Sequence, residues 1–351
     1  AINKFFISSL SPLISSIIII IFVGIYWLQE GQATSSEIHA LKGGLILALG
    51  TLIGAFSQWI IQIPTLLKEG LSQFKVIWDL KDSGVKEVLR IIAPATFSSG
   101  MLQINVFTDL FFASGILGAA AGLSYANFLV QAPLGILSNA LIIPLLPTLS
   151  RLVETGSRAL LEARIRQGLM LSLASMISIG VIFITLGTPI VSLFYARGAF
   201  DNDAIKLVTG LLIAYGIGMP AYLCRDLLVR VFYVLGDGKT PFQLSVIGIG
   251  LNILFDWALV GGPTPSGNKM PFDFGASGIV FATVAINFLT CASLLLQLNS
   301  RLGQLPLKKW SFDCLKLLIA GICSAQVAWI LRIFVTWPNN FPGLFSEVFI
   351  S

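Results

Sequence analysis

Two polar residues share a helical face in the apolar segment GIGLNILFDWALV. Asn252 and Asp256 are four positions apart, so a helix projects both side chains from one face. Asp109, in MLQINVFTDLFFASG, and the hydroxyl of Thr283 add oxygens from two other apolar runs. Carboxylate and amide oxygens suit a hard cation such as sodium. The pattern predicts an oxygen cluster for a cation, and hydrogen bonds that only join helices are the alternative.

A second polar group lies in AYLCRDLLVRVFYVLGDGKTPF. Arg225 and Arg230 are about one helical turn apart and flank Asp226. The planar guanidinium binds phosphate or carboxylate through two parallel N–H groups, so these arginines could meet an anionic headgroup. Snorkelling of both side chains to the inner membrane interface is the alternative. The GDGKTP stretch lacks the phosphate-loop spacing and follows an apolar run, so we expect a tight turn there.

The residues used by most catalytic and metal sites are scarce. His39 is the only histidine and lies in a polar connection, where we expect a solvated loop. The four cysteines show no C-x-x-C spacing, and we expect them to be buried and to pack as small hydrophobic residues. A membrane-embedded enzyme is therefore disfavoured, and sodium is the only ion or cofactor expected. The 22 Lys and Arg are interspersed among 17 Asp and Glu without a basic stripe, which argues against nucleic acid.

The elements that must position these residues are membrane helices. Hydrophobic residues make up 56% of the chain, charged residues only 11%, and the mean hydropathy is +0.88. Apolar runs long enough to cross ~30 Å of hydrocarbon recur along the whole chain. We therefore expect an all-α, polytopic transmembrane bundle. Its nine candidate spans are 5–28, 42–67, 84–113, 117–149, 160–187, 203–235, 241–261, 275–298 and 312–336.

The basic residues predict an orientation for these spans. Fourteen Lys and Arg fall in one set of alternate connections and four in the other. Because basic residues are retained in the cytoplasm, residue 1 is expected inside and residue 351 outside. The polar connection at 68–90 is the best candidate for a boundary between two packing units. The chain begins AINKFF, without Met, and we expect upstream sequence to be missing.

The segment GLSYANFLVQAPLGILSNALIIPLLPTLSRL resembles the MurJ/MviN family of lipid II flippases, within the multidrug/oligosaccharidyl-lipid/polysaccharide exporter superfamily. RVFYVLGDGKTPF and GASGIVFATVAIN resemble later family motifs in the same order. The resemblance covers most of the chain. Among the branches of the family, the cyanobacterial sequences are the most similar to it.

The resemblance implies two six-helix lobes and a terminal pair of helices, with this chain lacking about the first four helices. Residues 1–67 would be the last two helices of the N-terminal lobe, and 68–83 the cytoplasmic lobe linker. Residues 84–298 would form the C-terminal six-helix lobe. Residues 299–351 would hold a linker, one further transmembrane helix and a tail.

The resemblance also implies a function. Family members move a polyprenyl-pyrophosphate-linked peptidoglycan precursor across the bacterial inner membrane, by alternating access around a cationic cavity, in cell wall biogenesis and cell shape. No covalent bond changes, so an enzyme is not expected; the partners would be this substrate and membrane lipids, and the protein would be a monomer. Some members bind sodium, at positions that match Asp109, Asn252, Asp256 and Thr283, with the Ile279 carbonyl as a fifth ligand.

One departure from the family pattern affects the cavity. Phe128 stands where many members have an arginine directly after the YAN element. The remaining candidates for lining a substrate cavity, together with Phe128, are Asn105, Asn127, Gln131, Arg225 and Arg230. The loss of a cavity charge keeps three alternatives open: an exporter of another lipid-linked glycan, a cation-coupled multidrug antiporter, and a degenerate scaffold that does not transport.

Overall fold

The computed structural model describes residues 5–30, 37–61, 63–64, 104–198, 200–260, 272, 274–303 and 305–334. Within these ranges every regular element is a helix and no strand occurs, as expected for an all-α membrane protein. The chain divides into two compact units, Ala1–Leu89 and Arg90–Ser351, which we describe one at a time. The predicted lobe linker at 68–83 lies outside the described residues, so this boundary stays a prediction.

The first unit contains two helices packed side by side, α1 (Phe5–Glu30) and α2 (Glu37–Ile60). Gly54 allows their close approach, because an added Cβ would lie 3.0 Å from the carbonyl oxygen of Ser15. The Tyr26 hydroxyl donates to the backbone oxygen of His39 at 3.0 Å. Because α2 begins at Glu37, His39 lies in its first turn, and the expectation that His39 lies in a loop was wrong. The helix begins at the acidic Glu37, a residue type that a helix N-terminus favours, before the apolar run starts.

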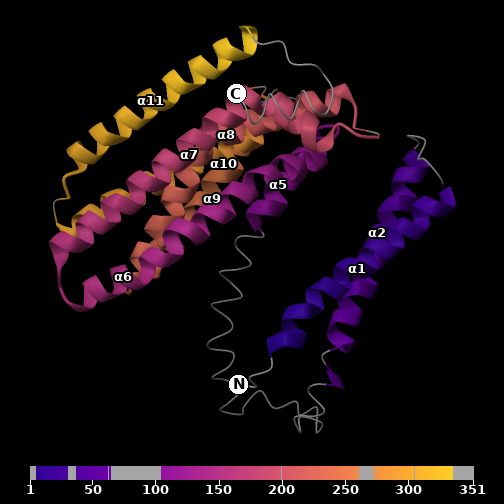
Figure 1. Ribbon diagram of the computed structural model, residues 1–351, viewed down its shortest axis with the longest axis horizontal. Helices are drawn as coiled ribbons and strands as arrows, with labels where there is room; N and C mark the ends of the chain where they lie inside the picture. Colours follow the sequence, from indigo (N-terminus) through magenta and orange to yellow (C-terminus); the bar gives the residue numbers. More distant parts are fainter. Residues whose placement is uncertain are drawn as a thin grey trace. The chain divides into compact units, whose positions relative to one another are not determined.

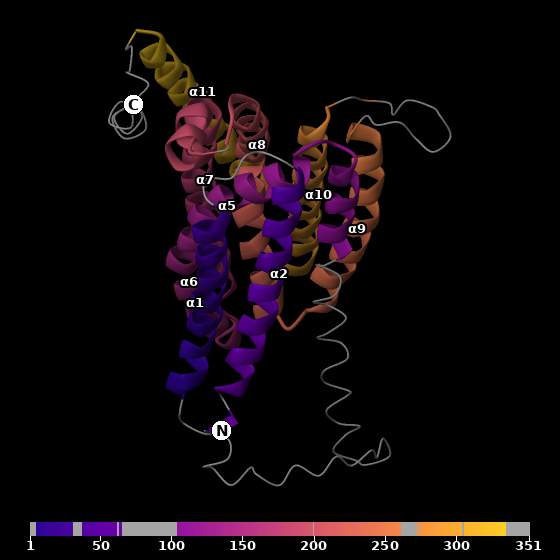
Figure 2. The ribbon, with the colours of Figure 1, turned by 90° about the vertical axis from the view of Figure 1, so that its right-hand side faces the viewer.

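The second unit holds the remaining described helices (Figures 1 and 2). They are an apolar helix at Ile104–Ser114, α5 (Ala119–Leu137), the π-helical turn η1 (Ser138–Ile142), α6 (Ile143–Glu154), α7 (Arg158–Tyr195), α8 (Asn202–Val234), α9 (Lys239–Val260), α10 (Ala276–Leu302) and α11 (Leu307–Phe334). The helix α8 packs against α5, α7 and α10 and forms the centre of the unit. Figure 1 shows α11 lying along α7.

Glycines set the closest helix crossings. An added Cβ on Gly180 of α7 would collide with the backbone oxygen of Gly216 in α8, and one on Gly218 would collide with Val284 of α10. Membrane helices gain little from covering one apolar face with another, because lipid is equally apolar; close van der Waals contact between backbones replaces that driving force. These two glycines therefore help to fix α8 between its neighbours.

Prolines bend the helices where the sequence places them. Pro144 has no N–H to donate to the carbonyl of Ala140, and the preceding turn, η1, widens to π geometry. In α7 the backbone leaves helical values at Leu186, three residues before Pro189. Pro133 and Pro144 both lie in one long apolar element, α5 to α6, and Pro94 lies outside the described residues.

Seven helices in the described part of the chain are long and apolar enough to cross a membrane. They coincide with predicted spans to within several residues at each end. Two shorter apolar helices, Leu13–Gln29 and Ile104–Ser114, lie within the first and third predicted spans. The polytopic bundle is therefore confirmed, whereas the total of nine spans stays a prediction.

Three of the cysteines partly or fully avoid solvent, and one does not. Cys224 is buried and Cys291 and Cys314 are half-buried, but Cys323 is exposed on α11. The expectation of buried cysteines was therefore wrong for Cys323. The sequence shows that a residue lies in an apolar helix, but not which face of that helix packs against protein.

The GDGKTP stretch forms the expected turn between α8 and α9. Gly236 adopts φ of 77°, and the Asp237 carboxylate accepts hydrogen bonds from the backbone N–H groups of Lys239 and Thr240 at 3.0 and 3.1 Å. Asp237 also pairs with Arg301, at the end of α10, at 2.6 Å. The Thr240 side-chain hydrogen bond, those backbone donors and the Arg301 charge hold the pKa of Asp237 below its usual 3.8, against the opposing effect of desolvation.

Candidate functional site

Two carboxylates and an amide meet where the Ile104–Ser114 helix faces α9. Asn252 Nδ2 donates to Asp109 Oδ1 at 3.0 Å and to Asp256 Oδ2 at 2.9 Å. Asn252 and Asp256 lie four residues apart on one face of α9, as the sequence predicted, and both are buried. The structure therefore brings together residues that are 143 positions apart in the sequence, Asp109 and Asn252.

The cluster has two oxygens without a partner. Asn252 Oδ1 and Asp256 Oδ1 are buried and accept no hydrogen bond. The amide of Asn252 must point its nitrogen at the carboxylates, since its oxygen would repel them. An unpaired buried oxygen is costly, and two neighbouring carboxylates require a cation or a proton between them. Two carboxylates held this close are therefore compatible with either a shared proton or a bound cation, and the sodium site stays a prediction.

The helix α10 supplies the other predicted ligands. Ile279 is 1% exposed, and Thr283 lies one turn further along the helix and lines the same cavity as Asn252. An added Cβ on Gly278 would collide with the backbone of Leu259, so this glycine permits α10 to approach α9. Among the described residues no three His, Cys, Asp or Glu side chains gather as a metal site, so amide, hydroxyl or carbonyl oxygens would have to complete a cation site here.

A cavity of about 540 Å³ opens beside the cluster. It lies between the Ile104–Ser114 helix, α8, α9 and α10 and includes Asn105, Arg225, Asn252 and Thr283 in its lining. Arg225 projects from the central helix α8, and its Nε atom is buried without a partner. The hydroxyl of Tyr222, one turn earlier, is likewise buried and unpaired. The cavity therefore presents unused hydrogen-bond donors next to the unused acceptors of the carboxylate cluster.

Asn287 joins the two halves of this site, and the sequence reasoning did not identify it. Its Oδ1 accepts from an Arg225 guanidinium nitrogen at 3.2 Å, and its Nδ2 donates to the Thr283 carbonyl at 2.7 Å. Asn287 is neutral and stands alone in an apolar helix, with no charged residue beside it in the sequence to mark it. The available signal was spacing: Asn287 follows Thr283 by four residues and so shares its helical face.

Arg230 lies in a neighbouring cavity of about 760 Å³, on the side of α8 that faces α6. Its Nε donates to Asp226 Oδ1 at 3.1 Å, and Ser138 donates to Asp226 Oδ2 at 2.8 Å. Ser138 is the first residue of η1, so the π-helical turn takes part in this network. Asp226 lines both cavities, and its ion pair with Arg230 stands between them.

The remaining predicted cavity residues do not join either cavity. Asn127, Phe128 and Gln131 lie on α5, all exposed, and the Phe128 side chain is 73% exposed. None of the three lines the cavity that contains Arg225. Their role in contacting substrate stays a prediction.

Comparison with known proteins identifies relatives of the chain. A family model described as lipid II flippase MurJ matches residues 1–345. A Synechocystis protein named probable lipid II flippase MurJ is 43% identical over 329 residues, covering 94% of this chain and 60% of that protein. A Rickettsia prowazekii protein of the same name is 30% identical over 256 residues, covering 72% of this chain and 47% of that protein.

A solved structure agrees with the fold. Lipid II flippase MurJ in an inward closed conformation matches with a TM-score of 0.73 at 23% identity, covering 99% of this chain and 66% of that one. The chain thus spans about half to two thirds of the length of the proteins that it matches.

Proposed function

Since this chain belongs to the lipid II flippase MurJ family, we propose that the protein translocates lipid II, a lipid-linked peptidoglycan precursor, across the cytoplasmic membrane. The membrane-crossing helices make it a multi-pass inner-membrane protein. Flipping moves the substrate between leaflets and changes no covalent bond, so the protein would work as a transporter and not as an enzyme. We also propose that it acts as a monomer.

The observation that carries this proposal is the Arg225 side chain in the 540 Å³ cavity. The Arg225 side chain lines this cavity, its Nε–H has no partner within the protein, and a guanidinium binds phosphate oxygens through charge-assisted hydrogen bonds. Asn287 holds another guanidinium nitrogen of Arg225 without neutralising the charge. Arg230 is different because Asp226 already neutralises it. We therefore assign the pyrophosphate contact to Arg225.

Complementation tests the proposal. Cells depleted of their own lipid II flippase receive the full-length protein, and lipid II exposed at the outer leaflet is quantified. Wild type is expected to restore exposure, and Arg225→Ala to lose most of it. Arg197→Ala, on the short connection between α7 and α8, provides a matched loss of one arginine outside the cavity. Failure of wild type to restore exposure while present in the membrane would contradict the proposal.

The carboxylate cluster supports a sodium site as part of this function. Asp109, Asn252 and Asp256 would hold the ion, with Thr283 and the Ile279 carbonyl supplied by α10. The unpaired oxygen of Asp256 supports this assignment, and the Asn252 amide would rotate on ion binding so that its oxygen, and not its nitrogen, faces the ion. A sodium ion would supply the positive charge that offsets two neighbouring carboxylates. Through Asp109 and α9 the cluster ties the Ile104–Ser114 helix to the rest of the unit.

Sodium binding is measurable by calorimetry on the full-length protein. Wild type is expected to bind sodium, and Asp256→Ala to abolish binding. Asp203→Ala removes an equally charged side chain that is 90% exposed at the start of α8, and should bind like wild type. Equal heats for wild type and Asp256→Ala would remove the ion site while leaving the flippase proposal open to its own test.

One observation favours a second function. Phe128 is 73% exposed on α5, where the family resemblance implies an arginine. The absence of a positive charge at this exposed position of α5 suits a less anionic cargo, such as another lipid-linked glycan or an organic cation exchanged for a cation. Proteoliposomes with labelled lipid II and with labelled organic cations separate these cargoes. Transport of organic cations alone would establish the antiporter, and transport of neither would favour a scaffold.

A further inference from the structure

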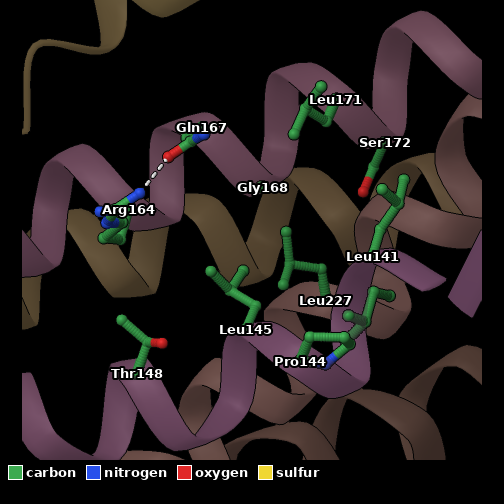
Figure 3. Close-up of a pocket in the computed structure, with 11 residues that line it drawn as sticks. Leu141, Pro144, Leu145, Thr148, Arg164, Gln167, Gly168, Leu171, Ser172 and Leu227 are labelled. Carbon is green, nitrogen blue, oxygen red and sulfur yellow. Dashed lines mark hydrogen bonds between the residues drawn. The ribbon is translucent and has the colours of Figure 1, made fainter. Parts of the chain in front are cut away.

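A separate pocket of about 280 Å³ lies on the other side of the unit's core, between η1 and α6, α7 and α8 (Figure 3). Leucines form its walls: Leu141 and Leu145 from η1 and α6, Leu171 from α7 and Leu227 from α8. It shares no lining residue with the cavity that contains Arg225. A ligand of this pocket would therefore contact a different set of residues from a ligand of the Arg225 cavity.

Gly168 lets side chains of α6 and α8 approach the α7 backbone closely. It lies in the middle of the α7 wall (Figure 3), and an added Cβ would meet Leu145 Cδ2 at 2.7 Å and Leu227 Cδ2 at 3.0 Å. On the opposite wall, Pro144 follows the widened turn η1. A glycine in α7 and a proline in α6 thus shape two of the walls that enclose the pocket.

The mouth of the pocket carries a positive charge. Arg164 is exposed there and donates to Gln167 Oε1 at 2.7 Å, as Figure 3 shows. Within the described part of the chain, Arg164 forms no ion pair with an acidic side chain. A guanidinium has five N–H donors, so several remain free for an anion. The distribution of basic residues puts this end of α7 on the cytoplasmic side.

The deep end of the pocket holds a second polar group. Ser172 is 1% exposed, lines the pocket and has no hydrogen-bond partner for its hydroxyl. It projects from α7 into the space near the leucines of η1 and α8 (Figure 3). Eight residues separate it from Arg164, which is about 12 Å along a helix at ~1.5 Å per residue. The pocket therefore runs from a charged mouth, past apolar walls, to an unpaired hydroxyl.

We propose that this pocket binds the headgroup and glycerol region of an anionic phospholipid from the cytoplasmic leaflet. The phosphate contacts Arg164 and Gln167, and an ester carbonyl accepts from the Ser172 hydroxyl. Basic pockets between membrane helices on the cytoplasmic side favour anionic headgroups, since that leaflet is rich in anionic lipid. A pocket of about 280 Å³ is slightly smaller than the ~300–1,000 Å³ of typical ligand sites, so the acyl chains remain in the bilayer.

This site does not depend on what the protein transports. It is distinct from the substrate cavity, and its lipid would be a resident of the membrane around the protein. The bound lipid would tie α6 to α7 at the cytoplasmic end, next to Leu227 of the central helix α8. Its physical consequence is added stability of the unit in membranes that contain anionic lipid.

The test measures retained lipid by native mass spectrometry of the purified full-length protein. Phosphatidylglycerol and phosphatidylcholine are titrated separately, so that charge is the only deliberate difference. Wild type is expected to bind one phosphatidylglycerol in clear preference to phosphatidylcholine. Arg164→Gln should weaken that binding about tenfold, as expected for the loss of a charge-assisted contact, and Ser172→Ala by a smaller factor.

Arg151→Gln is the matched control, because Arg151 is exposed on α6 at the same end of the unit and does not line the pocket. It should leave the preferential binding unchanged. Equal losses in Arg164→Gln and Arg151→Gln would show general charge attraction and overturn the proposal. Unchanged binding in both Arg164→Gln and Ser172→Ala, or equal binding of the two lipids by wild type, would also overturn it.

Discussion

The helices α8 and α11 have similar hydropathy and very different surroundings. Their most apolar windows have mean hydropathies of 1.7 and 1.5, but 67% of the α8 window is buried inside the protein and only 6% of the α11 window. The helix α8 carries Gly216 and Gly218 at close crossings and Arg225 and Asp226 in a polar network. Helix burial in this protein therefore depends on small and polar residues, since lipid solvates an apolar face as well as another helix does.

The contacts of α11 show the same rule with fewer groups. Gly321 packs closely on Ile177 of α7, and Asp313 pairs with Arg166 of α7. Most of its large apolar residues, such as Leu318 and Trp329, remain exposed. Packing, and not hydropathy, therefore distinguishes α8 from α11.

The largest expected effect is a matched pair of leucine truncations. Leu212→Ala in α8 removes a fully buried side chain and should lower the free energy of unfolding by about 2–5 kcal/mol. Leu318→Ala in α11 removes a side chain that is 45% exposed, and its effect should stay within ~0.5 kcal/mol. Thermal unfolding in detergent measures both. Equal losses of stability would show that α11 is packed as tightly as α8.

A second comparison adds a methyl group where helices cross. Gly180→Ala should destabilise by about 1–3 kcal/mol, because the new Cβ collides with the Gly216 backbone, which cannot rotate away as a side chain could. Gly135→Ala on α5 meets nothing within 4 Å and should be neutral or slightly stabilising. The midpoint of thermal unfolding of each variant decides the point, and a stable Gly180→Ala protein would rule out this crossing.

A third change tests the polar network on α8. Asn287→Ala removes the acceptor for Arg225 and should reduce lipid II export about tenfold, equivalent to ~1.4 kcal/mol. Asn287→Asp keeps an acceptor, but its negative charge would neutralise Arg225 as Asp226 neutralises Arg230, and it loses the donor to the Thr283 carbonyl. Export should therefore stay reduced if the free charge of Arg225 contacts the substrate.

Asn139→Ala is the control for Asn287, because Asn139 is exposed and bonds only to the Gly135 carbonyl of its own helix. Unchanged export in Asn287→Ala would show that the hydrogen bond between Arg225 and Asn287 of α10 does not matter for export. A loss in Asn139→Ala as large as that in Asn287→Ala would show a nonspecific effect of removing an amide.

The smallest expected effect is a pH dependence at the α8–α9 turn. Because the pKa of Asp237 is lowered in the folded protein, its contribution is present above the usual value of 3.8 and disappears as pH falls through the lowered pKa. Asp237→Asn should therefore unfold at a lower temperature than wild type near neutral pH, and the difference should shrink in acid. A difference that grows in acid would contradict the assigned ion pair with Arg301.

The sequence predicts the helices well because their signals are local. Apolar run length identifies the elements from α5 to α11, and Pro144 indicates a bend that appears as η1. The i, i+4 spacing places Asn252 and Asp256 on one face of α9, and the GDGKTP turn follows from its glycines. The errors at His39 and Cys323 concern a helix end and a helix face, which hydropathy does not specify.

Partners distant in the sequence were harder to predict. Motif order and the types of residue suggested that Asp109 joins Asn252 and Asp256, and the structure brings them into contact. The same reasoning grouped Arg225 with Arg230, whereas the structure puts them in different cavities, one beside Asn287 and one paired with Asp226. Adjacent turns of one helix can face different neighbours, and only those neighbours determine which charge remains free.

What the sequence by itself determined about this protein is its solvent, its all-helical class, its family and one oxygen cluster. The tertiary structure decided which helix lies at the centre, that Asn287 links Arg225 to Thr283, and that a pocket between α6, α7 and α8 is lined by both Arg164 and Ser172. The physical reason is range: hydropathy and helical spacing act over one or two turns, whereas cavities and shared hydrogen bonds depend on which helix faces meet.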